Sequence, residues 1–290
     1  MDTPFEDAPA KINLALHILG RRADGYHSLD TLVVFADIAD RLNVIDPEEG
    51  NDLTIDGPFA SALTSKQKTA DNLVHRAAVA ATARSQSPAT ARLRLTKNIP
   101  VGAGLGGGSA DAAATLRLLA PRLGLSSNDI AELGRSLGAD VPMCLESVAL
   151  RATGVGDDLN EVLIPPLPIV LVFPGVSVST ASVFGRLQNP IDPPLPSLPS
   201  RFRSIEDVVG WLGPTLNGLQ IAALREAPVI NEALSCLRAE RESLVARMTG
   251  SGSACFALFS TMAAAESAAA NIQRSQPGWW VRATATKGTR

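Results

Sequence analysis

The first clear pattern in the chain is a strict alternation of apolar and polar residues from Lys11 to Ile18. A period of two residues is typical of a strand with one buried face, so we expect a half-buried strand with Lys11 and Asn13 on its polar side. Asp24-Gly25 is a strong turn signal after it. Further apolar runs predict strands at 29–38, 41–45 and 53–55.

Helical spacing of apolar residues then alternates with short apolar runs through the rest of the chain. The predicted helices span 71–84, 110–120, 129–137, 181–187, 205–212, 216–225, 229–239 and 263–274. The predicted later strands span 91–95, 169–173, 244–248, 255–259 and 279–283. Asp71 or Asn72 is the expected cap of the first helix, and Ser127 or Asn128 that of the third. Strands and helices mix without regular β-α-β alternation, which indicates the α+β class.

Prolines mark the organisation of the chain. Pro165, Pro166 and Pro168 interrupt an apolar stretch, and we place a boundary there between two domains, 1–162 and 163–290. Pro121 is expected to end the second helix. Pro142 favours an extended Val141, which would place Asp140 at a junction between a helix and a strand. The Pro-rich stretch at 190–199 is expected to be a surface loop.

The segment from Pro100 to Ser109, PVGAGLGGGS, predicts an anion-binding loop. Its glycines allow the backbone to approach a ligand closely, and Ser109 is the expected cap of the helix that starts at Ala110. The free N–H groups and the positive dipole end of that helix then favour a phosphate.

Two other nucleotide-binding patterns share features with this segment. A Walker A loop requires Lys followed by Ser or Thr after its second glycine, and no Lys stands here. The spacing of Gly102, Gly104 and Gly107 does match G-x-G-x-x-G, which leaves a dinucleotide site open. However, Asp129, the acidic residue at the right distance, opens a helix and does not end a strand.

Composition is that of a globular protein with a large core: 290 residues, 46% hydrophobic and 19% charged. A net charge of −3 argues against nucleic acid as the main partner. The three cysteines are odd in number and widely spaced, so we expect reduced thiols without a disulfide framework. The acidic start lacks the basic region of a signal peptide, and no apolar window suits a membrane helix, so a cytoplasmic protein without a membrane partner is expected.

Three separated segments, Pro9–Leu14, Pro100–Ala114 and Gly250–Ser253, resemble the three motifs of the GHMP small-molecule kinases. Three more resemble the branch of that family that acts on a cytidine-diphosphate-linked methylerythritol: Ala23–His27, Leu137–Pro142 and Val178–Thr180. The matches run in order over nearly the whole length. By itself, Gly250–Ser253 is equally consistent with a plain hairpin turn.

The resemblance implies a two-domain α+β fold. Its N-terminal domain would resemble the second domain of ribosomal protein S5, its C-terminal domain would be ferredoxin-like, and the active site would lie in the cleft between them. Lys11 and Asp140 match the catalytic residues. Asp140 would orient the acceptor hydroxyl, and Lys11 would keep that carboxylate ionised and help to neutralise the transferring phosphoryl group. Alone, Lys11 would more simply be a surface lysine on an edge strand.

The resemblance also assigns binding residues. The ATP-binding residues would be Pro100, Val101, Gly102, Ala103, Gly104, Leu105, Gly106, Gly107, Gly108, Ser109 and Ala110. Tyr26, His27 and Phe184 would form the cytidine pocket, because an aromatic ring can stack on the base. The remaining substrate contacts would be Asn13, Thr180, Gly250, Ser251 and Gly252. Asn72 and Leu73 resemble the start of the helix that lines the adenine pocket.

The implied activity is ATP-dependent phosphorylation of the 2-hydroxyl of the cytidine-diphosphate-linked polyol, in the non-mevalonate isoprenoid pathway. Mg²⁺ is expected as charge neutraliser, with Ser109 as a candidate ligand. The alternatives are another GHMP kinase, of homoserine or mevalonate type, and a non-catalytic RNA- or nucleotide-binding module. The expected state is a monomer or weak homodimer. Three positions, Ser147, Asp157 and Gly218, depart from the family's pattern.

Overall fold

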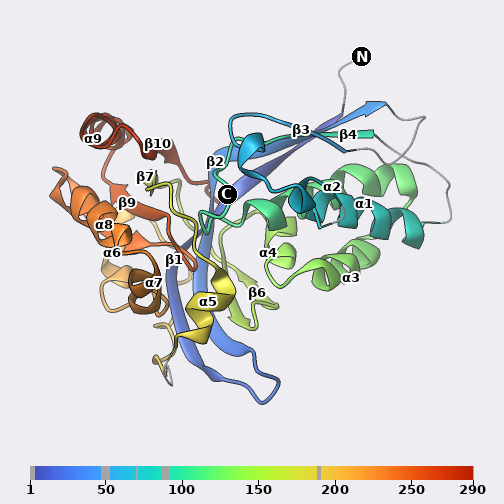
Figure 1. Cartoon of the computed structure of the whole chain (residues 1–290). Coiled ribbons are helices and arrows are strands. Elements are labelled where there is room, and N and C mark those ends of the chain that lie inside the picture. The colour runs from blue at the N-terminus through green and yellow to red at the C-terminus, as the bar shows by residue number, and fades with distance from the viewer. Residues whose placement is uncertain (1–3, 47–52, 70, 86–91, 188–190, 290) are drawn as a thin grey trace. The chain divides into compact units, whose positions relative to one another are not determined.

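The computed structural model describes residues 4–46, 53–69, 71–85, 92–187 and 191–289 (Figure 1). Contacts divide the chain into two compact units that interleave along the sequence. The first comprises Met1–Lys11, Ile38–Val101 and Gly106–Ser147, and the second comprises Ile12–Asp37, Gly102–Leu105 and Val148–Arg290. Two long strands, β1 (Phe5–Arg21) and β2 (His27–Asp46), contribute to both units. The single domain boundary at 162 and 163 remains a prediction.

In its described part, the first unit combines a small sheet with four α-helices. Strand β4 (Arg92–Thr96) pairs antiparallel with the end of β2 and parallel with β3 (Leu53–Asp56). Helices α1 (Leu73–Arg84), α2 (Gly107–Leu123), α3 (Ser127–Leu137) and α4 (Val141–Glu146) pack on one another (Figure 1). Two single turns of 3₁₀ helix, η1 (Ala60–Ala62) and η2 (Lys66–Lys68), precede α1.

Local hydrogen bonds explain where these helices begin and end. Asn72 caps α1 as predicted, because its side chain accepts from the N–H of Val74. The cap of α3 is Ser126, one residue before the predicted pair, in a reciprocal capping box with Asp129. The prediction that α2 ends at Pro121 was wrong. The helix continues to Leu123, and a left-handed Gly124 closes it while the N–H of Leu125 bonds the carbonyl of Ala120.

The second unit contains an antiparallel sheet in the order β10 (Trp280–Ala285), β7 (Pro168–Phe173), β9 (Cys255–Phe259) and β8 (Ser243–Met248). Helices α8 (Val229–Ala239) and α9 (Met262–Ser275) pack against it (Figure 1). Shorter helices complete the unit: α5 (Thr180–Gly185), α6 (Ile205–Leu212) and α7 (Gln220–Glu226). The first half of β2 pairs with β5 (Leu150–Gly154), which pairs with β6 (Asp158–Glu161).

The α+β class is confirmed, and three strand predictions need correction. The runs at 29–38 and 41–45 form one continuous strand, β2, and β5 and β6 were not predicted. Strand β1 is buried on both faces from Ala8 to Ile18, so Lys11 and Asn13 lie in the interior. Predictions for residues 91 and 190 lie outside the described residues.

The three cysteines and the lengths of the helices bear on two further expectations. All three cysteines are free, and burial raises the pKa of Cys144 to about 12, so its thiol stays protonated. No helix in the described part of the chain combines the length and apolar character needed to cross a bilayer.

Candidate active site

The two predicted catalytic residues lie together in the first unit. The Nζ atom of Lys11, on β1, is 2.9 Å from Oδ2 of Asp140. The lysine side chain is only 7% exposed, whereas the carboxylate is 44% exposed. Lys11 is therefore held in the interior against the side chain of Asp140, and that side chain remains open to an incoming molecule.

Asp140 is not at a junction between a helix and a strand, as predicted. It is the N-cap residue of α4, and Pro142 lies within the first turn of that helix. The prediction failed because a proline there needs no backbone N–H, since the first N–H groups of a helix have no intrahelical acceptor. Asp140 therefore lies in a tight connection between α3 and α4, with its carboxylate free of any capping bond.

The start of α2 is also assembled differently from the prediction. Ser109 is not its cap; Gly106 is, in a left-handed conformation with φ +67°, and Ser109 is the third helical residue. The first helical hydrogen bond joins Ala110 N to Gly106 O at 2.9 Å. The N–H groups of Gly107, Gly108 and Ser109 precede that bond, so they form the donor set of the helix N-terminus.

Gly106 brings this helix start against Lys11. A Cβ atom at Gly106 would lie 3.0 Å from Cβ and 3.2 Å from Cε of Lys11. The absence of a side chain therefore permits the close approach, and the positive φ suits glycine. The ion pair of Lys11 with Asp140 and the anion-binding end of α2 share one region of the first unit.

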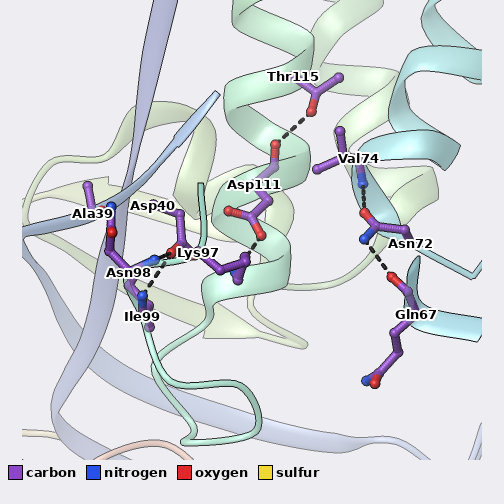
Figure 2. A network of polar contacts seen from close by, with 10 residues as sticks. All are labelled: Ala39, Asp40, Gln67, Asn72, Val74, Lys97, Asn98, Ile99, Asp111 and Thr115. Atoms are coloured by element: carbon purple, nitrogen blue, oxygen red, sulfur yellow. Dashed lines mark hydrogen bonds and ion pairs between the residues drawn. The ribbon is translucent and has the colours of Figure 1, made fainter. Parts of the chain in front are cut away.

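A buried ion cluster lies next to the same helix start, and the sequence analysis missed it (Figure 2). The ammonium of Lys97 contacts the carboxylates of Asp40 and Asp111, with 2.7 Å to Asp111. A Cβ on Gly107 would lie 3.4 Å from Lys97 Nζ, which places the cluster directly against the first turn of α2. The sequence signal for this cluster was Asp111 itself, because it is an acidic residue among the buried residues of an Ala-rich helix.

The electrostatics of the cluster follow from two carboxylates that share one ammonium. Burial raises the pKa of Asp111 to about 7, because the attraction of Lys97 only partly offsets desolvation and Asp40 repels the second charge. Burial by itself would lower the pKa of Lys97, but Asp111 and Asp40 outweigh it and raise that pKa. Oδ1 of Asp111 has no hydrogen-bond partner among the described residues.

Asp40 also directs the chain that leads into the glycine loop. Its Oδ1 accepts hydrogen bonds from the backbone N–H groups of Asn98 and Ile99, at 2.5 and 2.8 Å (Figure 2).

On α1, Leu73 lies beside the loop, because a Cβ on Gly108 would be 3.6 Å from its Cδ1 atom. The predicted adenine-lining start of α1 therefore lies against the start of α2.

In the second unit, Asn13 is held by two threonines. Its backbone N–H donates to Oγ1 of Thr249 and its Nδ2 donates to Oγ1 of Thr31, both at 2.8 Å. The amide orientation is thereby set, and its buried Oδ1 has no partner among the described residues. A buried acceptor left in this way is suited to a donor group on a ligand.

Two glycine turns pack backbone to backbone in the same unit. A Cβ on Gly104 would lie 2.5 Å from the carbonyl oxygen of Gly252, and one on Gly250 would lie 2.7 Å from that of Gly104. The N–H of Ala254 bonds the carbonyl of Ala103 at 2.9 Å. Only glycine permits this approach, so the first half of the predicted ATP loop and the turn 250–253 form one structure.

The predicted substrate residues of this unit lie in two groups. Oγ1 of Thr180 and Oγ of Ser251 are 2.8 Å apart, which joins α5 to the turn. The rings of His27 and Phe184 have centroids 5.2 Å apart. Burial, and then the charge of Arg21, lowers the pKa of His27, which favours the neutral imidazole. The side chain of Tyr26, the third residue of the predicted cytidine pocket, is 66% exposed.

The three departures from the family pattern have local explanations. Ser147 adopts a left-handed φ of +50°, where glycine would be unstrained, and its hydroxyl donates to the carbonyl of Cys144. Asp157 accepts from the N–H of Val155 in the turn between β5 and β6. At Gly218, a Cβ would collide with the carboxylate of Asp192, which accepts a hydrogen bond from the N–H of Ile18.

Asn217 is a further residue that sequence reasoning missed. It is buried, its Nδ2 donates to the carbonyls of Met248 and Gly250 at 2.8 and 2.9 Å, and its Oδ1 accepts from Leu219 N at 2.9 Å. In the sequence, the available signal was its place directly before Gly218, one of the three departures from the family's pattern. Among the described residues, no three His, Cys, Asp or Glu side chains gather into a metal-binding group.

Comparison with known proteins places this geometry in a family. Residues 72–147 match the GHMP kinases N terminal domain and residues 200–277 match GHMP kinases C terminal. The chain is 44% identical to the 4-diphosphocytidyl-2-C-methyl-D-erythritol kinase of Dinoroseobacter shibae, over 96% of this chain and 93% of the relative. It is 48% identical to the kinase of the same name from Methylorubrum extorquens, over 96% and 97% of the two chains.

A solved structure gives the same result for the fold. The crystal structure of a 4-(cytidine 5'-diphospho)-2C-methyl-D-erythritol kinase superposes with a TM-score of 0.80 at 36% identity, covering 98% of this chain and all of that one. The two-domain GHMP kinase fold predicted from the motifs is confirmed. The chain belongs to the GHMP kinase family, among the 4-diphosphocytidyl-2-C-methyl-D-erythritol kinases.

Proposed function

We propose that this chain transfers the γ-phosphoryl group of ATP to the 2-hydroxyl of 4-diphosphocytidyl-2-C-methyl-D-erythritol, giving the 2-phosphate and ADP. The observation that carries the proposal is the ion pair of Lys11 with Asp140 beside the capped start of α2. The names of relatives that are 44 and 48% identical over nearly the whole chain support the choice of substrate.

In this mechanism, Asp140 orients the acceptor hydroxyl. Lys11 is 2.9 Å from its Oδ2 and favours the ionised carboxylate, which accepts a hydrogen bond from the alcohol. The bond from the acceptor oxygen to the γ-phosphorus forms while the bond from that phosphorus to the β–γ bridging oxygen breaks. The hydroxyl proton passes to Asp140 late, as expected for a loose transition state. The ammonium of Lys11 stabilises the charge on the transferring group.

The N–H groups of Gly107, Gly108 and Ser109 bind the phosphates of ATP, because they precede the first bond of α2. Leu73, which lies against that helix start, contributes an apolar surface for the adenine. Asn13 presents its unpaired Oδ1 to the acceptor substrate. The paired rings of His27 and Phe184, with the exposed Tyr26, receive the cytosine.

The residues at the start of α2 fit a Mg²⁺ ion bound mainly by nucleotide. Mg²⁺ is usually held by one or two protein oxygens together with phosphate oxygens and water. The half-buried hydroxyl of Ser109 makes no hydrogen bond within the described residues, and it stands among the phosphate-binding N–H groups. Ser109 would hold the ion, which supplies charge neutralisation to the β- and γ-phosphates when bound.

The test is coupled ADP release by the purified chain, offered 4-diphosphocytidyl-2-C-methyl-D-erythritol, homoserine, mevalonate and galactose in parallel. The first acceptor is expected to give the highest kcat/KM. A higher kcat/KM for another acceptor would mean that the chain has a different GHMP kinase activity. Salt-sensitive RNA binding without ADP release would instead favour the non-catalytic alternative.

A further inference from the structure

The turn at 250–253 contains a backbone N–H donor, in a residue that is nearly buried, whose direction is set by one side chain. The N–H of Ser251 makes no hydrogen bond within the described residues, although Ser251 is only 7% exposed. A buried backbone N–H without a partner is costly in a folded chain unless a ligand or water satisfies it. The unpaired Oδ1 of Asn13 faces the same turn, 3.6 Å from the position of a Cβ on Gly250. Two unpaired polar atoms therefore point to a ligand here.

Asn217 determines which way the peptide group between Gly250 and Ser251 faces. Its Nδ2 holds the carbonyl oxygen of Gly250 at 2.9 Å. In a planar trans peptide the C=O and the following N–H point in opposite directions. The carbonyl that faces Asn217 thus directs the N–H of Ser251 away from Asn217.

The position of Asn217 is itself firmly determined. Its backbone lies in a parallel bridge with Leu16, and the N–H of Gly218 bonds the carbonyl of Leu16 at 2.7 Å. Its side chain makes three hydrogen bonds, and all of them are to backbone groups. Two carbonyl oxygens accept from Nδ2, and the N–H of Leu219 donates to Oδ1. The amide has one orientation that satisfies these bonds, because only the NH₂ group can donate to both carbonyls.

We propose that Asn217 is a positioning residue, which orients the turn 250–253 so that the N–H of Ser251 is presented to the diphosphate of the acceptor substrate. This inference rests on the proposed function. Asn217 does not touch the substrate; it acts through the Gly250 peptide. The bond of Ser251 Oγ with Thr180 holds the other side of the same residue.

The experiment compares the binding of CDP and cytidine to the wild type and to Asn217→Asp. The aspartate has the same size but no NH₂ group, and its oxygen would face two carbonyl oxygens, so the Gly250 peptide is expected to turn. A hydrogen bond to a charged group is lost, and CDP affinity should fall roughly tenfold or more while cytidine affinity is kept. KM for the acceptor should rise, and KM for ATP should change by less than about threefold.

The matched control is Arg247→Lys. Arg247 is a half-buried side chain that donates to Leu212 O and Thr215 Oγ1 in the same segment and to Leu14 O, and among the described residues no hydrogen bond joins it to the turn. This variant should lower Tm and leave the ratio of CDP to cytidine affinity unchanged. A merely structural role for Asn217 predicts that Asn217→Asp behaves in the same way, and that result would overturn the proposal.

A measurement on the wild type covers the case in which Asn217→Asp does not fold. With ¹⁵N-labelled serine, the amide resonance of Ser251 should shift when CDP is added and stay in place with cytidine. An unmoved resonance with bound CDP would overturn the proposal. If the wild type neither binds CDP nor releases ADP, the proposed function itself fails; if it does both and the variant keeps the affinity ratio, only the positioning role fails.

Discussion

Replacement of Gly104 by alanine tests the backbone packing of the two glycine turns. The matched control is Gly175→Ala, because the two glycines have nearly the same φ, +81° and +82°. They differ in the space around them. A Cβ at Gly104 would lie 2.5 Å from the carbonyl oxygen of Gly252, whereas nothing lies within 4 Å of one at Gly175.

The expected magnitudes follow from this difference. A left-handed alanine costs about 1–2 kcal/mol relative to glycine, and this applies to both variants. At Gly104 the contact is with backbone, which no side-chain rotation relieves, so the overpacking adds about 1–3 kcal/mol. For a domain of roughly 150–250 residues, each kcal/mol lowers Tm by about 2–4 °C. Gly104→Ala should therefore melt below Gly175→Ala by several degrees.

Activity should separate the variants further. The alanine at 104 displaces either the loop or the turn, and a displacement of about 1 Å in a binding group can cost on the order of 100-fold in rate. Thermal unfolding with coupled ADP release measures both effects. Gly175→Ala should retain wild-type kcat. If the two variants lose the same stability and the same activity, the close packing of the two turns contributes to neither.

Three further predictions concern single side chains. Lys11→Ala and Asp140→Asn should each lower kcat by roughly 100-fold or more in ADP release, with unchanged folding by circular dichroism; near-wild-type rates would remove them from the mechanism. In the folded chain burial raises the pKa of Asp111 from 3.8 to about 7, so the stability that its proton provides is lost as pH rises between those values. Asp111→Asn has no such titration, so the free energy of unfolding of the wild type should fall relative to that of the variant from about pH 5 to pH 8, by at most about 3 kcal/mol; a difference independent of pH would contradict this. Tyr26→Ala should leave Tm unchanged, because the ring is 66% exposed, and raise KM for the cytidine-linked acceptor. An unchanged KM would exclude stacking.

Sequence patterns located most helices and strands, because the formation of these elements depends on neighbouring residues. The bounds of α8 and β9 agree with the predicted 229–239 and 255–259, since an amphipathic helix and a short apolar strand each show their period within a few residues. The same local reasoning failed at α4. Pro142 predicts an extended backbone at Val141, but in the first turn of a helix a proline has no backbone hydrogen bond to lose.

Much of the candidate site was also visible in the sequence. The loop glycines, Lys11 and Asp140 stand in recognisable motifs, and the structure brings the ion pair and the start of α2 together. The cap was wrongly assigned to Ser109. The left-handed conformation available to Gly106 starts the helix three residues earlier than the Ala-rich pattern did.

The sequence by itself therefore determined the family, the order of the elements and the two residues proposed for phosphoryl transfer. Each of these depends on a short motif or on a hydrophobic period that is visible within a few neighbouring residues. Tertiary structure alone decided which groups share a site. Lys97, Asp40 and Asp111 are far apart in the chain, as are Asn217 and Gly250, and no local pattern links them. Their roles follow from burial, which leaves a charge or a backbone carbonyl only the partners that the fold brings within reach.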